Sequence, residues 1–187
     1  MTIPIPDIPI LMYHEVWAEM TQESQIRHTN PAYIVARQTF EEQMQYLHDN
    51  EFRTLTLDEY LEGSRHNDRK RVIITFDDGW HNNYSQAFPT LKTLGLKATI
   101  FVATDFIGQK DYMDWAQLKE MQDAGISVQS HTASHGALTE KSELEIKEEL
   151  SLSKKNIEDR LGTPVQYLSA PHGMVDQAVI DAAMNIG

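Results

Sequence analysis

Apolar and polar residues follow a repeating plan from residue 71 to the end of the chain. A run rich in β-branched and aromatic residues leads into a polar loop. The loop leads into a segment whose apolar residues have helical spacing and which ends at a glycine. Residues 72–76 are apolar almost throughout, as expected of a strand buried on both faces. The same reasoning predicts further strands at 98–103, 126–130 and 165–170.

Helices are predicted between these strands. Phe88, Leu91 and Leu94 have helical spacing. The next two helices begin at capping boxes, in which a polar N-cap residue pairs with Glu or Gln three positions later. The two pairs are Asp114 with Gln117 and Ser142 with Glu145. Glycines suited to a left-handed C-cap follow the helices at Gly95, Gly125 and Gly162.

The upstream and downstream segments extend this plan. Residues 8–13 are predicted to form a strand and residues 175–185 a helix. A further helix, capped by Thr39 with Glu42, is predicted from the apolar stripe Phe40, Met44 and Leu47. Strands that alternate with helices imply a parallel sheet, either open or closed into a barrel, and we favour a barrel.

A length of 187 residues suits a single domain with a proper core. Gly187 stands where the earlier helices end just before a strand, so the pattern predicts one more strand beyond it. We therefore expect residues 1–187 to form one domain that lacks the C-terminal elements of a barrel.

Composition narrows the choice of partners and compartments. The formal net charge of −12 argues against a nucleic-acid or anionic-membrane partner, since both reward clustered Lys and Arg. The absence of cysteine excludes disulfides and thiolate zinc sites. No apolar run approaches the ~20 residues of a membrane span, and the N-terminus lacks the features of a signal peptide. The expected location is the cytoplasm by default, or the cell exterior if an export signal was removed.

Polar residues cluster where the predicted strands end. In parallel α/β folds the C-terminal ends of the strands face one side, and functional side chains gather there. Four clusters have this position, namely His14, Asp77-Asp78, His131 to His135, and Pro171-His172-Gly173.

Asp78, His131 and His135 form a candidate metal site. The two histidines are four residues apart, a spacing that on one helical turn lets both imidazoles reach a single ion. Two histidines and one carboxylate make a facial set with open positions, as in catalytic metal sites. Taken alone, Asp77-Asp78 would be a loop or capping pair, and His131 with His135 would be two surface histidines. Their positions directly after predicted strands favour metal ligation. We expect one divalent ion, zinc by default, with cobalt, nickel, iron or manganese also compatible.

This combination resembles the polysaccharide deacetylase family, also called the NodB-homology group or carbohydrate esterase family 4. Thr75-Phe76-Asp77-Asp78-Gly79 is similar to its first motif, T-F-D-D-G, and His131-Thr132-Ala133-Ser134-His135 to its second, H-[ST]-x-x-H. The resemblance covers roughly residues 8–187 and implies a distorted, incomplete (β/α) barrel.

Carried over position by position, the resemblance makes Asp77 the general base. It makes Asp78, His131 and His135 the metal ligands. The third family motif, R-x-P-[YF]-G, aligns with residues 169–173. Pro171 and Gly173 fit this motif, whereas Ser169 replaces the arginine that normally orients the base. The way in which Asp77 is tuned is therefore a question for the structure.

His14 is the candidate general acid. The usual acid of the family comes from a later motif, but some members carry a Tyr-His pair on the first strand, and Tyr13-His14 resembles that pair. Histidine is the usual proton donor near neutral pH. The alternative role is a histidine that is merely hydrogen-bonded at a strand end.

The resemblance implies removal of N-acetyl groups from a polysaccharide that contains N-acetylglucosamine. The residues expected to contact this carbohydrate are Trp80, Pro171, His172 and Gly173. Two alternatives stay open: hydrolysis of another small-molecule amide on the same fold, and a non-catalytic carbohydrate-binding relic. The replacement at Ser169 favours the relic, whereas retention of Asp77 beside an intact ligand set favours the enzyme.

Overall fold

The computed structural model describes residues 8–19, 33–62 and 70–187. Its centre is a sheet in which every pair of strands is parallel. The strands run in the order β1 (Ile10–Tyr13), β5 (Arg71–Phe76), β6 (Thr99–Val102) and β7 (Ser127–Ser130). A short strand, β4 (Arg53–Thr54), pairs with the first two residues of β5. A separate parallel pair joins β2 (Glu15–Trp17) to β3 (Ile34–Ala36).

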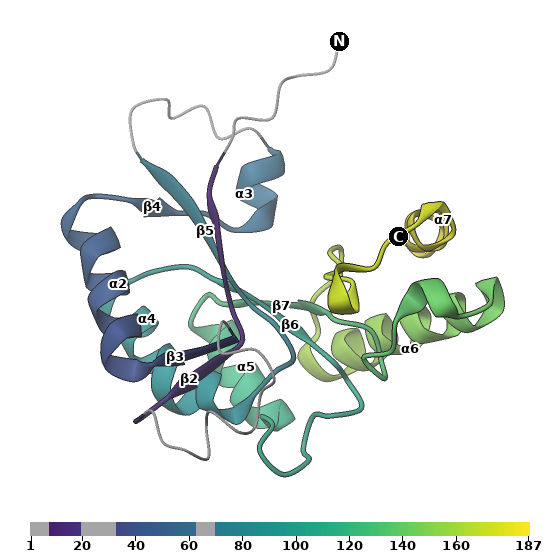
Figure 1. Cartoon of the computed structure of the whole chain (residues 1–187), viewed down its shortest axis with the longest axis horizontal. Helices are drawn as coiled ribbons and strands as arrows, with labels where there is room; N and C mark the ends of the chain where they lie inside the picture. The colour runs from purple at the N-terminus through teal and green to yellow at the C-terminus, as the bar shows by residue number, and fades with distance from the viewer. Residues whose placement is uncertain (1–7, 20–32, 63–69) are drawn as a thin grey trace.

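Helices cover the outer side of the curved sheet (Figure 1). They are α2 (Arg37–Asp49), α4 (Phe88–Leu94), α5 (Trp115–Asp123) and α6 (Glu143–Leu161). The last helix, α7 (Gln177–Ile186), packs against α6. Strands and helices do not close into a ring, so the predicted distorted, incomplete (β/α) barrel is confirmed. The helices of the described residues are too short or too polar to cross a bilayer.

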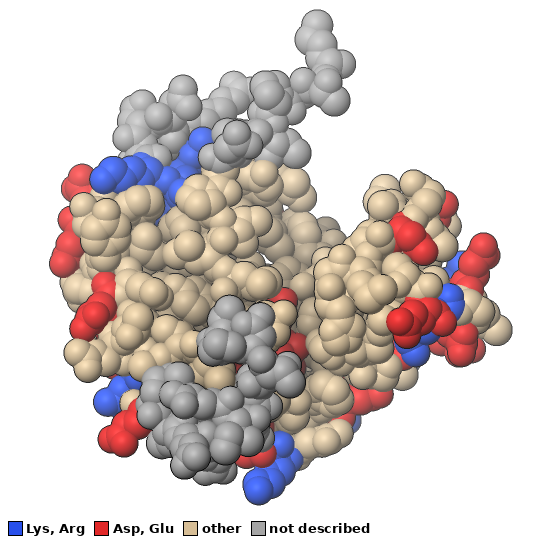
Figure 2. Space-filling view, in the orientation of Figure 1, with Lys and Arg blue, Asp and Glu red and all other residues tan. Residues whose placement is uncertain are grey.

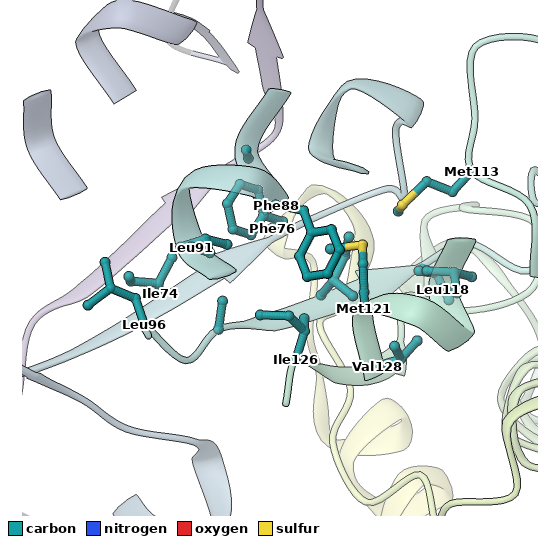
Figure 3. Packing of buried hydrophobic residues seen from close by; sticks show 14 of the residues in the cluster. Ile74, Phe76, Phe88, Leu91, Leu96, Met113, Leu118, Met121, Ile126 and Val128 are labelled. Carbon is teal, nitrogen blue, oxygen red and sulfur yellow. The ribbon is translucent and has the colours of Figure 1, made fainter. Parts of the chain in front are cut away.

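The main core fills the space between the sheet and the outer helices. Alternate residues of β5, namely Val72, Ile74 and Phe76, point into this core, as the two-residue period of a strand requires. Figure 3 shows Ile74 and Phe76 of β5 in one cluster with Leu91 of α4 and Met121 of α5. A second, smaller cluster lies where α6 and α7 meet, and it contains Leu138, Ile146, Leu150, Val179 and Ala182.

Local helix signals were predicted well. Both capping boxes are present, because the side chains of Asp114 and Ser142 accept hydrogen bonds from the backbone N–H three residues later. Gly95 and Gly162 are C-caps with φ of 64° and 72°, a left-handed conformation that only glycine adopts at little cost. The starts of α5 and α6 and the ends of α4 and α6 therefore follow from short sequence motifs.

Two predicted elements were wrong in detail. Helix α2 begins at Arg37 with Ala36 as an uncapped N-cap, because β3 runs directly into it, so Thr39 and Glu42 lie inside the helix. The predicted strand at 165–170 is reduced to one bridge between Leu168 and Ser130.

The side chain of Gln129 explains the loss of this strand. Its Oε1 atom accepts hydrogen bonds from the backbone N–H groups of Gln166 and Tyr167 at 3.0 and 3.1 Å. Those two N–H groups are therefore satisfied by a side chain and do not join a backbone ladder.

Several short elements had no prediction. Helix α3 (Leu57–Leu61) begins at a capping box of Thr56 and Glu59, a signal that is present in the sequence. A π-helical turn, η2 (Asn83–Ala87), precedes α4, and two 3₁₀ turns occupy η3 (Leu138–Glu140) and η4 (Pro171–Gly173).

Candidate metal centre and catalytic residues

The three predicted ligands come together at the C-terminal ends of the parallel strands. Asp78 follows β5, and His131 and His135 follow β7, with β6 between the two strands. One potential ligand atom from each residue lies within 4.8 Å of those of the other two. In the described part of the chain, no other set of three His, Asp or Glu residues comes together in this way. Parallel pairing thus joins residues more than 50 positions apart in sequence.

The ligand atoms converge on one oxygen of Asp78. Its Oδ1 atom lies 3.3 Å from Nε2 of His131 and 3.1 Å from Nε2 of His135. His131 is almost fully buried and His135 is partly exposed, so the group is closed on one side and open on the other. The imidazole of His135 is therefore the part of this group that solvent can reach.

A hydrogen bond on the far side of the ring orients His131. Nδ1 of His131 lies 2.7 Å from the backbone carbonyl oxygen of Ser169. A carbonyl oxygen only accepts, so Nδ1 carries a proton, and in the neutral ring Nε2 presents its lone pair toward Asp78. Carbonyl partners of this kind orient metal-binding histidines in proteins generally.

Electrostatics at this point call for a positive charge. Burial opposes ionisation of Asp78, but its contacts with His131 and His135 hold the pKa of its carboxyl well below the usual range. Burial likewise opposes protonation of His131, but Asp78 and Asp77 raise the pKa of its imidazole. Both pKa shifts have the same cause. The carboxylate oxygen of Asp78 faces the imidazole nitrogens of the two histidines, and a cation or a proton between these atoms stabilises the group.

The residues present fit a divalent metal ion. Oδ1 of Asp78 is buried and has no hydrogen-bond partner among the described residues, which is costly unless something else satisfies it. Two imidazole nitrogens and one carboxylate oxygen are a ligand set that zinc and several first-row transition metals accept. Asp78, His131 and His135 would hold such an ion.

The loop from His131 to His135 is not the helical turn that its spacing predicted. Thr132 and His135 have φ of 68° and 61°, so the backbone turns twice through the left-handed region. The hydroxyl of Thr132 accepts a hydrogen bond from the N–H of His135 at 3.1 Å, which closes the turn. Four-residue spacing therefore brings the two rings together, 4.8 Å apart, through a bent loop.

Asp77 lies beside the ligand group, and Ser169 contacts it. The hydroxyl of Ser169 is 3.3 Å from Oδ2 of Asp77. Burial raises the pKa of the Asp77 carboxyl, while the charges of His131 and His14 and the Ser169 hydroxyl act in the opposite direction. The predicted base is thus buried next to the candidate metal site, in electrostatic contact with the predicted acid.

His14 is held by its backbone and by its ring. Nδ2 of Asn83 donates a hydrogen bond to the carbonyl oxygen of His14 at 2.6 Å, from the π-helical turn η2. The imidazole stacks on Tyr33 with 4.3 Å between the ring centroids. The end of β1 is therefore fixed against the segment that follows the Asp77-Asp78 pair.

The residues predicted to bind substrate surround the ligands in different ways. The indole N–H of Trp80 donates to Oδ2 of Asp78 at 2.9 Å, and its ring stacks on Tyr112. The His172 ring lies 4.9 Å from that of His135, edge to face, and His172 is exposed. Pro171 is buried and Gly173 is exposed in the same 3₁₀ turn. Trp80 thus supports a ligand directly, a contact that its sequence position did not reveal.

The surface is hollowed between two parts of the molecule. Figure 2 shows this hollow between the region that carries α2 and the region that carries α6 and α7. Charged side chains on this face gather mainly at its outer margin.

Sequence reasoning missed Glu149 and the contacts of Ser169. Glu149 on α6 accepts hydrogen bonds from the loop that carries both histidines. It directly precedes the buried Leu150 and lies one turn after the buried Ile146, so an acidic residue beside an apolar stripe was the available signal. Ser169 was recognised only as a replacement for arginine.

Together, the fold and the site define a class: an incomplete parallel (β/α) barrel with a candidate two-histidine, one-carboxylate metal centre at its strand ends. The sequence profile of the polysaccharide deacetylase family matches residues 64–187. The chain belongs to this family.

Individual relatives agree with this assignment. YxkH of Bacillus subtilis, which carries the name of the family, is 36% identical over 183 residues, covering 96% of this chain and 62% of the relative. A poly-beta-1,6-N-acetyl-D-glucosamine N-deacetylase of Staphylococcus aureus is 27% identical over 160 residues, covering 77% of this chain and 55% of that enzyme. The chain thus spans less than two thirds of the length of these curated relatives.

Solved structures show the same fold. The deacetylase PplD of Streptococcus pyogenes, solved with acetate, superposes with a TM-score of 0.86 at 29% identity, covering 96% of this chain and 80% of that one. A polysaccharide deacetylase from Bacillus cereus superposes with a TM-score of 0.84 at 32% identity, covering 96% of this chain and 55% of that one.

Proposed function

We propose that this chain is a metal-dependent hydrolase that removes N-acetyl groups from a polysaccharide containing N-acetylglucosamine. The observation that carries the proposal is the buried Asp77 carboxylate beside the convergent ligand group of Asp78, His131 and His135. The staphylococcal relative is named for deacetylation of such a polymer, which supports the substrate class.

In the proposed reaction, water cleaves the amide into acetate and a free amine. A divalent ion held by Asp78, His131 and His135 would supply Lewis-acid polarisation of the acetyl carbonyl and would make water more acidic. Asp77 takes the proton of the attacking water as the oxygen bonds to the carbonyl carbon. His14 then donates a proton to the nitrogen as the C–N bond breaks, which releases the neutral amine and acetic acid. The proton held by Asp77 returns to His14 through solvent, and the released products exchange a proton to give acetate and an ammonium group.

The supporting residues fit these roles. Trp80 and the Ser169 carbonyl orient two of the ligands, and the Ser169 hydroxyl orients the base. His172 is exposed and its ring contacts that of His135, a position that a substrate bound at the centre would reach. Pro171, Gly173 and His172 are therefore proposed to line the substrate site.

The test is metal-dependent release of amines from N-acetylglucosamine oligomers, detected with fluorescamine. Metal-free protein, protein with zinc, cobalt or nickel, and the Asp77→Asn variant are compared. Asp159→Asn serves as the matched control, because Asp159 is exposed and pairs with Lys155 on the outer surface of α6. We expect metal-dependent release that falls about 10²- to 10⁴-fold in Asp77→Asn and stays unchanged in Asp159→Asn.

Other outcomes separate the alternatives. Stoichiometric metal binding without release from any oligomer, but with release from small N-acyl amines, would replace the polysaccharide by a small amide. Oligomer binding without any hydrolysis in the presence of metal would indicate a carbohydrate-binding relic.

A further inference from the structure

The carboxylate of Glu149 binds the loop that carries both histidine ligands. Its Oε2 atom accepts hydrogen bonds from the backbone N–H groups of Ala133 at 3.1 Å and Ser134 at 2.9 Å. Its Oε1 atom accepts a hydrogen bond from the hydroxyl of Ser134 and lies 3.2 Å from Nζ of Lys141. The side chain is only 12% exposed, so these contacts are largely shielded from water.

The geometry of the loop explains why a carboxylate sits there. Two successive N–H groups that point to one side form a concave, electropositive nest that binds anions. Here both N–H groups converge on a single oxygen of Glu149. The carbonyls of Thr132 and Ala133 accept from the N–H groups of Thr104 and Asp105, after β6. The peptide groups between the two histidines are thus held from both sides.

This loop has a conformation that needs such support. Non-glycine residues are strained in the left-handed region and persist there only where their surroundings impose the conformation. Thr132 and His135 both lie in that region, and His135 is itself a ligand. A loop that relaxed at Ala133 and Ser134 would move the imidazole of His135 relative to that of His131.

The charged neighbours of Glu149 favour its ionised form. Burial raises the pKa of its carboxyl, but the hydrogen bonds from Ser134 and the contact with Lys141 outweigh burial and lower it. The aliphatic end of Lys141 passes over Gly136, where an added Cβ would lie 3.0 Å from its Cε. Lys141 is thereby placed to neutralise Glu149 without contacting the ligands.

We infer that Glu149 is a positioning residue of the metal centre, which holds the backbone between His131 and His135 in the conformation that lets both imidazoles bind one ion. This inference rests on the proposed function only in assuming that the ligand group binds a metal. Glu149 contacts neither ligand side chain in this role, so its effect is on metal affinity, and it takes no part in proton transfer.

The experiment is a titration of the metal-free protein with Co²⁺, followed by d–d absorption, with Zn²⁺ competition to give both affinities. Glu149→Ala removes all four contacts, and Glu149→Gln keeps the shape and one acceptor oxygen. The matched control is Glu148→Gln, an exposed neighbour on the same helix. Partners that orient metal ligands are worth about 10- to 100-fold in affinity, so we expect a loss in that range for Glu149→Ala, a smaller loss for Glu149→Gln, and none for Glu148→Gln.

A second readout separates positioning from a general effect on the fold. Amine release by Glu149→Gln should recover toward the wild-type kcat as the metal concentration rises, because only occupancy is impaired. Unchanged Co²⁺ and Zn²⁺ affinities in folded Glu149→Gln and Glu149→Ala would overturn the inference, as would a wild-type chain that binds neither ion. If metal affinity falls as expected but no oligomer is deacetylated by the wild type, the proposed substrate is wrong and the role of Glu149 stands.

Discussion

The hydroxyl of Ser169 reaches Oδ2 of Asp77, with 3.3 Å between the two oxygens. The serine stands where the family motif has an arginine, and its backbone carbonyl contacts His131 at the same time. One residue therefore joins the candidate base to a metal ligand. The serine supplies a neutral hydrogen bond to the base, and the arginine would have supplied a charge.

Ser169→Ala should separate these two contacts. The carbonyl contact with His131 remains, so metal affinity should be unchanged. Loss of one neutral hydrogen bond, about 1 kcal/mol, should lower kcat about five-fold. Burial raises the pKa of the Asp77 carboxyl, and the Ser169 hydroxyl lowers it. Removal of this hydroxyl should therefore raise the pKa of the base and move the acid limb of the pH–rate profile to higher pH. A large loss of bound zinc, measured after dialysis, would contradict this division of roles.

Asp78→Asn should abolish stabilisation by metal. A ligand that binds only the folded state at 100 times its Kd adds about 2.7 kcal/mol. We expect zinc to raise the melting temperature of the wild-type protein and of Asp159→Asn, and to leave that of Asp78→Asn almost unchanged. Scanning calorimetry with and without zinc gives both values. An equal rise in Asp78→Asn would place the metal elsewhere.

Trp80→Phe tests the support that the indole gives to Asp78. Phenylalanine keeps a ring beside Tyr112 but removes the donor to Oδ2 of Asp78, so zinc affinity should fall about 10-fold. Co²⁺ should quench tryptophan fluorescence in the wild type and much less in Trp80→Phe. Trp115→Phe, on α5 beside Arg160, is the control and should keep the quenching. Equal quenching in both variants would show that Trp80 is not near the ion.

His14→Gln tests the proposed acid. Glutamine can occupy the end of β1 and keep the backbone contact with Asn83, but it cannot deliver a proton. We expect kcat to fall about 10²- to 10⁴-fold and the alkaline limb of the bell-shaped pH–rate profile to disappear, with metal affinity unchanged. Steady-state rates between mildly acid and alkaline pH measure this. A preserved alkaline limb would assign the acid to another group.

Glu59 should make stability depend on pH in acid solution. Burial alone would raise the pKa of its carboxyl, but hydrogen bonds from Lys97, Thr56 and Arg53 lower it to about 2. Because the pKa of Glu59 is lower in the folded state, its ionised carboxylate stabilises the folded protein at pH values above the unfolded-state pKa. This stabilisation is lost as pH falls from about 4.5 toward 2.

The measurement is urea unfolding of the wild type and Glu59→Gln across this pH range. Because the group is partly solvated, we expect a difference of about 1 kcal/mol near pH 6 that disappears near pH 2. Glu62→Gln, at the exposed C-cap of α3, should show no such difference. A constant difference across the range would exclude titration of Glu59 as its cause.

The sequence predicts what is encoded locally. Capping boxes at Asp114 and Ser142 and the C-cap Gly162 define their helices because each signal acts within one turn. The ligand group was also predictable, since parallel strands place Asp78 and His131 at the same end of the sheet whatever the details of the loops.

Other features depend on contacts between distant segments. Gln129 captures two N–H groups nearly 40 positions away, and no local signal foretells that a side chain will replace a strand partner. The loop conformation at Thr132 depends on Glu149 and on Thr104, each of which belongs to another element. Spacing alone favoured a helical turn there, because i and i+4 share a helical face, and tertiary hydrogen bonds decided otherwise.

Backbone strain also bears on how this protein can adapt. Among the described residues, non-glycine positions with positive φ include four at the candidate centre, Asp78, Thr132, His135 and His172. Glycine at such a position would relieve strain, yet at each of the four it would delete a side chain that the centre uses or a loop contact that supports it. Heat tolerance and catalytic competence therefore compete for the same few positions. Substitutions that raise the thermal stability of the protein, in evolution or by design, are therefore expected in the outer helices and not at these four residues.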